Sequence, residues 1–265
     1  MTTATQPLSG RVALVTGLSR RVGIGYAIVG RLLDDGASVF ASGWTPHDEE
    51  MHWGADPFDA DTFDPHRFAH TEADLTDPAT PAQLVEQTVE RFGAIDIVVA
   101  NHARSSPGGL AEVTAEELDA CWAINARSSV LLAQSLDRAS DGTRGGGRLV
   151  LFTSGQALGP MDGELAYAIS KGAIHQMTAS LANAVADKGI TVNTINPGPV
   201  DTGYATGAMN KAIAETFPAK RWGQPEDVAR LVAWLVSDEA AWITGQIINS
   251  EGGFRRWLAP RPNDG

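Results

Sequence analysis

The chain has 265 residues, of which 43% are hydrophobic and 20% charged, which is enough for one large α/β domain with a substantial core. A formal net charge of −12 argues against a duplex nucleic-acid partner, because neutralising phosphates requires clustered Lys and Arg. Cys121 is the single cysteine, and the sequence has neither a leader pattern nor an apolar stretch of the ~20 residues that span a bilayer. We therefore expect a cytoplasmic protein with no internal disulfide, membrane segment or nucleic-acid partner.

The predicted elements alternate between apolar strands and helices. Strand-like runs occupy residues 12–16, 38–42, 95–100, 148–152 and 191–195, with helical segments between most of them. Such alternation indicates a parallel sheet covered by helices on both faces. We predict an α/β fold: a single doubly wound, Rossmann-like domain over residues 1–265, with a parallel sheet of about seven strands. The polar or proline-rich ends, 1–9 and 259–265, are expected to be mobile.

Two stretches depart from this alternation. Residues 44–73 are rich in Asp, Glu and His, and we predict a mostly irregular acidic insertion at the surface. Their His and Asp show no metal-ligand spacing, so no metal site is expected. Residues 202–218 carry a short helical pattern flanked by Gly203 and Gly207, and such a segment can close over a pocket as a lid.

A glycine-rich loop follows the first predicted strand. It runs from Thr16-Gly17 through Gly23-Ile24-Gly25 and leads directly into a predicted helix. Glycines permit a tight turn and the close approach of a pyrophosphate, while the helix N-terminus supplies amide donors and a positive dipole. This placement predicts a dinucleotide-binding turn.

Tyr167 and Lys171 stand four residues apart, and Ser154 lies thirteen residues before the tyrosine. In a helix, residues at this spacing project from the same face. A cation beside a phenol favours the phenolate, so we expect the pKa of Tyr167 to fall below its usual value of ~10. The triplet predicts proton exchange with a carbonyl or an alcohol.

With these motifs in this order, the chain resembles the short-chain dehydrogenase/reductase superfamily from about Arg11 to Phe254. It is most similar to the 3-oxoacyl-carrier-protein-reductase-like branch, which shares the Ser-Arg-Arg loop and the ending Trp242 to Gly245. The resemblance implies a catalytic group of Asn125, Ser154, Tyr167 and Lys171. In that group the tyrosine transfers the proton, the serine stabilises charge on oxygen, the lysine holds the nicotinamide ribose and the asparagine keeps a relay water.

The resemblance also implies a nicotinamide cofactor. Its expected contacts are Gly17, Ser19, Arg20, Arg21, Gly23, Ile24, Trp44, Asp74, Leu75, Asn101, Tyr167, Lys171, Pro197, Gly198, Val200 and Thr202. The glycine loop has five residues between Gly17 and Gly23 where the common family form has three, so the phosphate cradle must differ locally. No acid stands at the end of the second strand, and Arg20 and Arg21 can pair with a 2′-phosphate. NADP(H) is therefore favoured over NAD(H).

The substrate is less constrained than the cofactor. His102, Gln156 and Met161 are expected to contact it, although His102 can equally be a packed histidine near a strand end. Three residues separate Tyr167 from Lys171, where enoyl reductases of the superfamily have six, which favours reduction of C=O over C=C. We expect a small-molecule ketone of the 3-oxoacyl type or a related one. Sugar, steroid or secondary-alcohol oxidation stays open, as does a non-catalytic nucleotide sensor or scaffold.

Two predicted helices are apolar over more of their circumference than one sheet face requires. They span residues 116–138 and 166–185. The resemblance implies that such helices pair between subunits. We therefore expect a homo-oligomer, either a tetramer or a dimer.

Overall fold

The computed structural model describes residues 6–204 and 207–258. The predicted mobile ends lie partly outside these residues. Within them, Leu8 is 1% exposed and its backbone N–H donates to the Asp35 carbonyl at 2.9 Å. This apolar side chain therefore anchors residues 6–9 in the core, and the mobility predicted for the ends stays a prediction.

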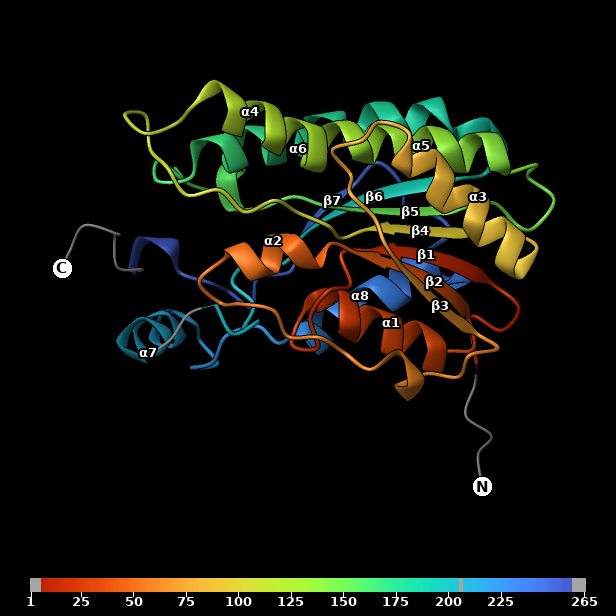
Figure 1. Ribbon diagram of the computed structural model, residues 1–265, viewed down its shortest axis with the longest axis horizontal. Coiled ribbons are helices and arrows are strands. Elements are labelled where there is room, and N and C mark those ends of the chain that lie inside the picture. Colours follow the sequence, from red (N-terminus) through yellow and green to blue (C-terminus); the bar gives the residue numbers. More distant parts are fainter. Residues whose placement is uncertain (1–5, 205–206, 259–265) are drawn as a thin grey trace.

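A seven-stranded parallel sheet forms the centre of the molecule, as the sequence predicts (Figure 1). The spatial order is β3-β2-β1-β4-β5-β6-β7. The strands are β1 (Val12–Thr16), β2 (Ser38–Gly43), β3 (Phe68–Glu72), β4 (Ile97–Ala100), β5 (Arg148–Phe152), β6 (Thr191–Asn196) and β7 (Ile247–Asn249). Thr16 pairs with Ser42 on one side and Ala100 on the other, so the carboxyl ends of these three strands are level.

Helices cover both faces of this sheet (Figure 1). One layer contains α1 (Ile24–Asp34) and α8 (Pro225–Val236), and the other contains α3 (Thr80–Phe92), α5 (Ser128–Ala139) and α6 (Leu165–Ala184). Alternate residues of β1 pack into the two layers: Ala13 and Val15 face one core and Leu14 faces the other. Burial on both faces explains why the central strands are continuously apolar.

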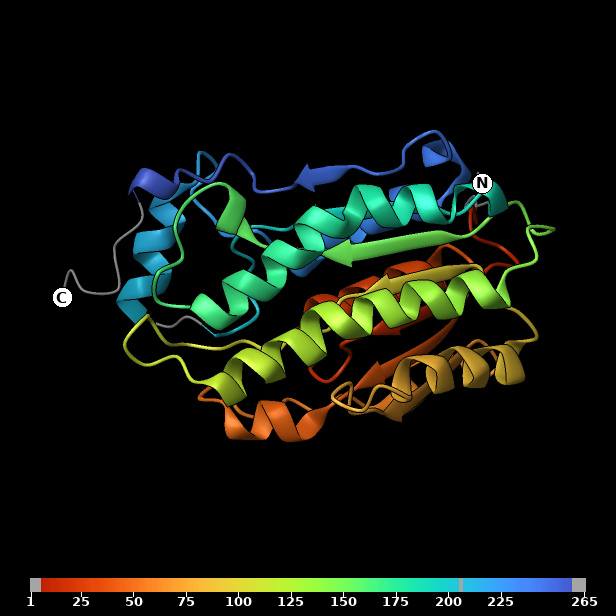
Figure 2. The ribbon, with the colours of Figure 1, turned by 90° about the horizontal axis from the view of Figure 1, so that it is seen from above.

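The remaining helices lie toward the carboxyl ends of the strands or extend α5. Helices α2 (Thr45–Glu50) and α7 (Gly207–Thr216) lie at the end toward which the strand arrows point (Figure 2). Helix α4 (Ala115–Cys121) continues through a π-helical turn, Trp122–Arg127, into α5. Within the described residues, no helix is long and apolar enough to cross a membrane.

The insertion at residues 44–73 is more regular than the sequence predicts. It contains α2, a 3₁₀ turn (Ala60–Thr62) and the edge strand β3. Phe58 and Phe63 each lie against Phe68 of β3, with ring centroids 6.4 and 4.7 Å from it. The segment is therefore partly regular, and three aromatic side chains anchor the acidic stretch to the core.

Candidate active site

The predicted site residues gather at the carboxyl ends of the parallel strands. Gly17 follows β1, Asn101 follows β4, Ser154 lies just beyond β5, and the pair Pro197 and Gly198 follows β6. In open parallel α/β sheets, ligands bind in the crevice at this edge. The fold therefore brings together residues that are separated by most of the chain.

The first turn has the geometry of a pyrophosphate cradle. Gly17 has a φ of +82°, and a Cβ on it would lie 2.8 Å from Asn101 Nδ2. Helix α1 begins after Gly23 with no side-chain cap and no acidic residue in its first turn. The amides of that turn therefore meet no competing side-chain acceptor there, and a helix N-terminus favours an anion. These features fit a dinucleotide, and Asn101 Nδ2 fixes the turn by donating to the Gly17 carbonyl at 3.2 Å.

The insertion braces the enlarged glycine loop. Arg21 Nη2 lies 3.3 Å from Asp56 Oδ1, and the same carboxylate accepts the Val22 N–H at 3.1 Å. The guanidinium of Arg20 lies 5.9 Å from the centre of the Trp53 ring. Its Nε is buried and, within the described part of the chain, has no hydrogen-bond partner. Asp56 therefore competes with a phosphate for Arg21, whose predicted cofactor contact stays a prediction, whereas Arg20 has a buried nitrogen that no protein acceptor within the described residues meets.

Other predicted cofactor contacts are held by the protein itself. Ser19 Oγ donates to Asp48 Oδ2 at 2.5 Å, so this hydroxyl ties the loop to α2. Leu75 and Val200 are 6% and 4% exposed and pack into the two cores, which leaves only their backbone to face a cofactor. Trp44 is 40% exposed at the start of α2.

Tyr167 and Lys171 lie on successive turns of α6, beside the end of β5. Lys171 Nζ is 5.6 Å from the centre of the Tyr167 ring and donates to the Phe152 carbonyl at 2.9 Å. Thr153 Oγ1 donates to the Lys171 carbonyl at 2.8 Å. These two bonds fix the register between β5 and α6, and so place Ser154 next to the phenol.

Burial controls the protonation of this pair. Burial raises the pKa of Tyr167 to about 12, while a hydrogen bond with Ser154 acts in the opposite direction. Burial also lowers the pKa of Lys171 to about 8. The expected lowering of the phenol pKa is therefore wrong for this structure, because desolvation of the phenolate outweighs every favourable contact. At neutral pH the phenol is protonated and can donate.

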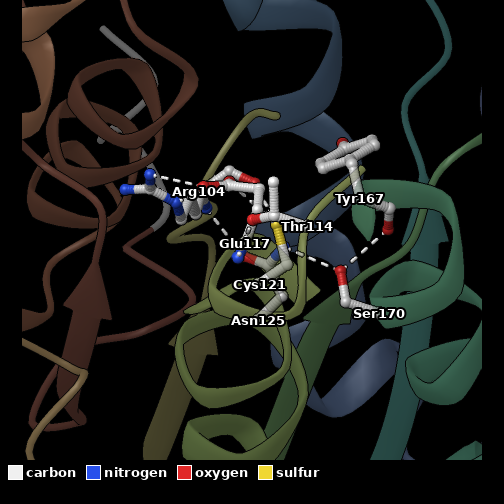
Figure 3. A network of polar contacts seen from close by, with 7 residues as sticks. All are labelled: Arg104, Thr114, Glu117, Cys121, Asn125, Tyr167 and Ser170. Carbon is white, nitrogen blue, oxygen red and sulfur yellow. Dashed lines mark hydrogen bonds and ion pairs between the residues drawn. The ribbon is translucent and has the colours of Figure 1, made fainter. Parts of the chain in front are cut away.

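Asn125 lies in the π-helical turn and joins two segments of the site (Figure 3). Its Oδ1 accepts the Arg104 N–H at 2.7 Å, and its Nδ2 donates to Ser170 Oγ at 2.8 Å. Ser170 Oγ in turn donates to the Tyr167 carbonyl at 2.8 Å. Asn125 therefore links the loop after β4 to the helix that carries the phenol; its relay water stays a prediction.

Sequence reasoning missed the residues that support Asn125. Arg104 binds Glu117 through two hydrogen bonds of 2.8 and 2.9 Å (Figure 3). Thr114 caps α4 by accepting the Glu117 N–H, and Thr-x-x-Glu is a recognised capping pattern. That pattern could have located the start of the helix, but nothing in it links Glu117 to Arg104. Burial raises the pKa of the adjacent Cys121 thiol to about 11, so it is not a nucleophile at neutral pH.

The three predicted substrate contacts lie in different surroundings. Met161 Sδ lies 4.0 Å from Ser154 Oγ, so its side chain is beside the hydroxyl that is predicted to be catalytic. Gln156 Nε2 donates to Thr153 Oγ1 at 3.0 Å, which turns the amide back toward β5. The substrate roles of Met161 and Gln156 both stay predictions, and Gln156 Oε1 has no hydrogen-bond partner among the described residues.

His102 has the contacts of a packed histidine near a strand end, and its substrate contact stays a prediction. It is 8% exposed, with Nδ1 2.6 Å from Thr16 Oγ1 and Nε2 2.7 Å from Ser128 Oγ. Nε2 also lies 2.9 Å from the Ile124 carbonyl. Burial and then the charge of Lys171 lower the pKa of His102 to about 3, so the ring is neutral. It connects the end of β1 to the π-helical turn.

Comparisons with known proteins agree with the fold that positions this site. A family model described as enoyl-(acyl carrier protein) reductase matches residues 17–255. The uncharacterized oxidoreductase YjdA of Bacillus subtilis is 38% identical over 253 residues, covering 93% of this chain and 97% of the relative. A solved short-chain dehydrogenase/reductase from Serratia marcescens has a TM-score of 0.74 at 32% identity, covering 94% of this chain and 99% of that one. A blue fluorescent protein from a metagenomic library, solved in complex with NADPH, has a TM-score of 0.79 at 32% identity with the same coverage.

Proposed function

Since the chain belongs to the short-chain dehydrogenase/reductase superfamily and is an NAD(P)-dependent oxidoreductase, we propose that it reduces a ketone with NADPH. One observation carries the proposal: a half-buried, protonated Tyr167 lies beside Ser154, with Lys171 on the next helical turn. Two hydroxyls arranged in this way suit a carbonyl oxygen that gains negative charge.

Each side chain has a separate task in the proposed reduction. A bound nicotinamide supplies the hydride to the carbonyl carbon. Ser154 donates a hydrogen bond to the carbonyl oxygen, and Tyr167 transfers its phenolic proton to that oxygen. The ammonium of Lys171, 5.6 Å from the ring centre, then stabilises the phenolate. Because both hydroxyls serve one oxygen, the arrangement favours C=O over C=C reduction.

The test is an NADPH-oxidation screen over ketones, β-ketoesters and sugars, run beside the same screen with NADH. We expect turnover of at least one ketone, with NADPH preferred. Cofactor binding without turnover of any of these compounds would support a nucleotide sensor instead.

The choice of NADP(H) rests on Arg20. Its buried Nε has no partner within residues 6–204 and 207–258, whereas Arg21 is held by Asp56. We expect Arg20→Ala to raise the dissociation constant of NADPH about 10-fold or more and that of NADH less than about twofold, since a charge-assisted hydrogen bond contributes ~1.5–3 kcal/mol. Isothermal titration with both cofactors measures this. Arg21→Ala is the matched control, and tighter binding of NADH than NADPH by the unmodified protein would contradict the assignment.

We also propose that α7 and the residues before it act as a lid. Tyr204, in that segment, is 38% exposed as a whole residue. The pKa of Tyr204 is raised by burial of its hydroxyl first, then by the charges of Glu164 and Tyr167. The phenols of Tyr204 and Tyr167 therefore lie close enough to influence each other. His52 Nε2 lies 3.1 Å from the Tyr204 carbonyl, which ties the segment to the insertion. A lid at this position would exclude water from the phenol during proton transfer.

Assembly is the last part of the proposal. The two helical segments that are more apolar than one sheet face requires, 116–138 and 166–185, expose large apolar side chains. These are Trp122, Val130 and Ile169, which are 51%, 40% and 57% exposed. Exposed apolar side chains on adjoining helices suit contact with a second copy of the chain. Sedimentation equilibrium is expected to give a dimer or tetramer; a monomer at all concentrations would rule this out.

A further inference from the structure

An ion pair outside the predicted site lies against its catalytic turn. Arg256, in the 3₁₀ turn Arg256–Leu258, binds Glu251 through both ends of its guanidinium. The Nη1–Oε2 distance is 2.8 Å, and Nη2 contacts Oε1. The two side chains are 23% and 10% exposed. A two-point pair of this kind fixes the plane of the guanidinium as well as its position.

The guanidinium of Arg256 packs against Gly155, the residue that follows Ser154. A Cβ built on Gly155 would lie 3.0 Å from Arg256 Cζ and 3.1 Å from its Nε. The Cδ of the same arginine lies 3.4 Å from the corresponding position on Gly159. Gly155 has no side chain of its own with which to anchor the turn. The arginine therefore supplies the packing surface that this part of the backbone lacks.

The same ion pair contacts the opposite wall of the site. Glu251 Oε1 also accepts from Asn196 Nδ2 at 2.7 Å, at the end of β6. Gly198 lies so close to Glu251 that a Cβ on it would be 3.0 Å from Glu251 Cβ. Since Pro197 and Gly198 form the predicted nicotinamide contact, Glu251 connects that segment to the guanidinium on Gly155.

A third contact reaches the proposed lid. The Arg256 guanidinium carbon lies 5.1 Å from the Phe254 ring centre, and Phe254 lies 5.1 Å from Phe217, just after α7. The Arg255 N–H donates to the Thr216 carbonyl at 3.3 Å. Residues 251–256 therefore pack between the lid helix, the β6 end and the Ser154 turn.

We propose that Arg256 is a positioning residue for Ser154, acting through Gly155. Hydrogen bonding to a carbonyl oxygen requires the serine hydroxyl at a fixed place, and a displacement of about 1 Å can cost up to ~10²-fold in rate. The guanidinium, held by Glu251, prevents the Gly155 backbone from relaxing away from the phenol. The proposal rests on the oxidoreductase chemistry proposed for Tyr167 and Ser154.

The kinetic test is a double-mutant cycle on the full chain with the carbonyl compound that turns over fastest in the screen. We expect Arg256→Ala to lower kcat about 10-fold and to leave the NADPH dissociation constant within about twofold. In a Ser154→Ala background, the same substitution should lower kcat less than about twofold. Arg255→Ala, which removes the same charge from an exposed neighbour, should leave kcat unchanged. Equal losses with the Ser154 hydroxyl present and with it removed would indicate general structural damage and overturn the proposal.

A second double-mutant cycle measures thermal stability and needs no substrate. Gly155→Ala should lower the melting temperature of the otherwise unmodified protein by about 3 °C, because the new methyl group displaces the guanidinium. In the Arg256→Ala background the same substitution should have almost no effect, since Gly155 has no positive φ that alanine would strain. Additive losses would show that the two residues are not coupled. If the protein turns over no carbonyl compound, the proposed function fails, and this cycle still decides whether Arg256 holds the turn.

Discussion

Tyr167→Phe is expected to lower kcat/KM for carbonyl reduction about 10³-fold while leaving the NADPH dissociation constant within about twofold, since positioned acids contribute ~10²–10⁴-fold. In the proposed reaction the phenol protonates the carbonyl oxygen, and burial keeps it protonated, with a pKa of about 12. Phenylalanine retains the ring that faces Lys171 and removes only the proton donor. Steady-state kinetics with NADPH, together with fluorescence titration of the cofactor, separates the two effects.

Tyr26→Phe provides the matched control for this substitution. Tyr26 packs against Phe58 and Phe63, at centroid distances of 6.1 and 5.4 Å, on the α1 side of the sheet. Removing its hydroxyl should leave the reductive rate within about twofold, because it touches no reacting group. A Tyr167→Phe protein that is folded, binds NADPH and retains near-normal turnover would refute the role of the phenol.

The central strands could be predicted because burial on both faces makes them continuously apolar. β1 and β4 are buried at every residue, and their sequences show it. The edge strand β3 is different, since only Phe68 of its five residues is fully buried. An edge strand needs no continuous apolar run, so β3 could not be separated from the acidic residues before it.

The same distinction applies to the site. Tyr167 and Lys171 could be paired from sequence because helical periodicity relates residues four positions apart. Contacts between distant segments leave no such period. Arg21 meets Asp56 because the fold brings two loops together, and Arg104 meets Glu117 because it brings a loop and a helix together. The contact between Arg21 and Asp56 was not predicted for this reason: Asp56 lies in a segment that had no predicted contact with the loop.

A substitution of Lys171 is expected to move stability and activity in opposite directions. The side chain is 2% exposed, and its ammonium donates to the Phe152 carbonyl at 2.9 Å. Among the described residues it has no carboxylate partner. An unpaired buried charge is costly, and the lowered pKa of about 8 corresponds to a cost of about 3 kcal/mol at neutral pH. We expect Lys171→Met to raise the melting temperature of the cofactor-free protein by about 4 °C or more.

The same variant should lose at least about 10²-fold in kcat/KM, because the phenolate then has no cation beside it, and should bind NADPH more weakly. The pH dependence of stability identifies the cause. The folded-state pKa of Lys171 is lowered from 10.5 to about 8, so between these values the unfolded chain binds more protons than the folded one. Its unfolding free energy therefore rises with pH across that window, by up to about 1.4 kcal/mol per pH unit. Chemical denaturation at a pH of about 7.5 and again at about 9.5 should detect this rise in the unmodified protein. Lys171→Met should not show it. Parallel curves for the two proteins would mean that the ammonium is not the group that burial penalises.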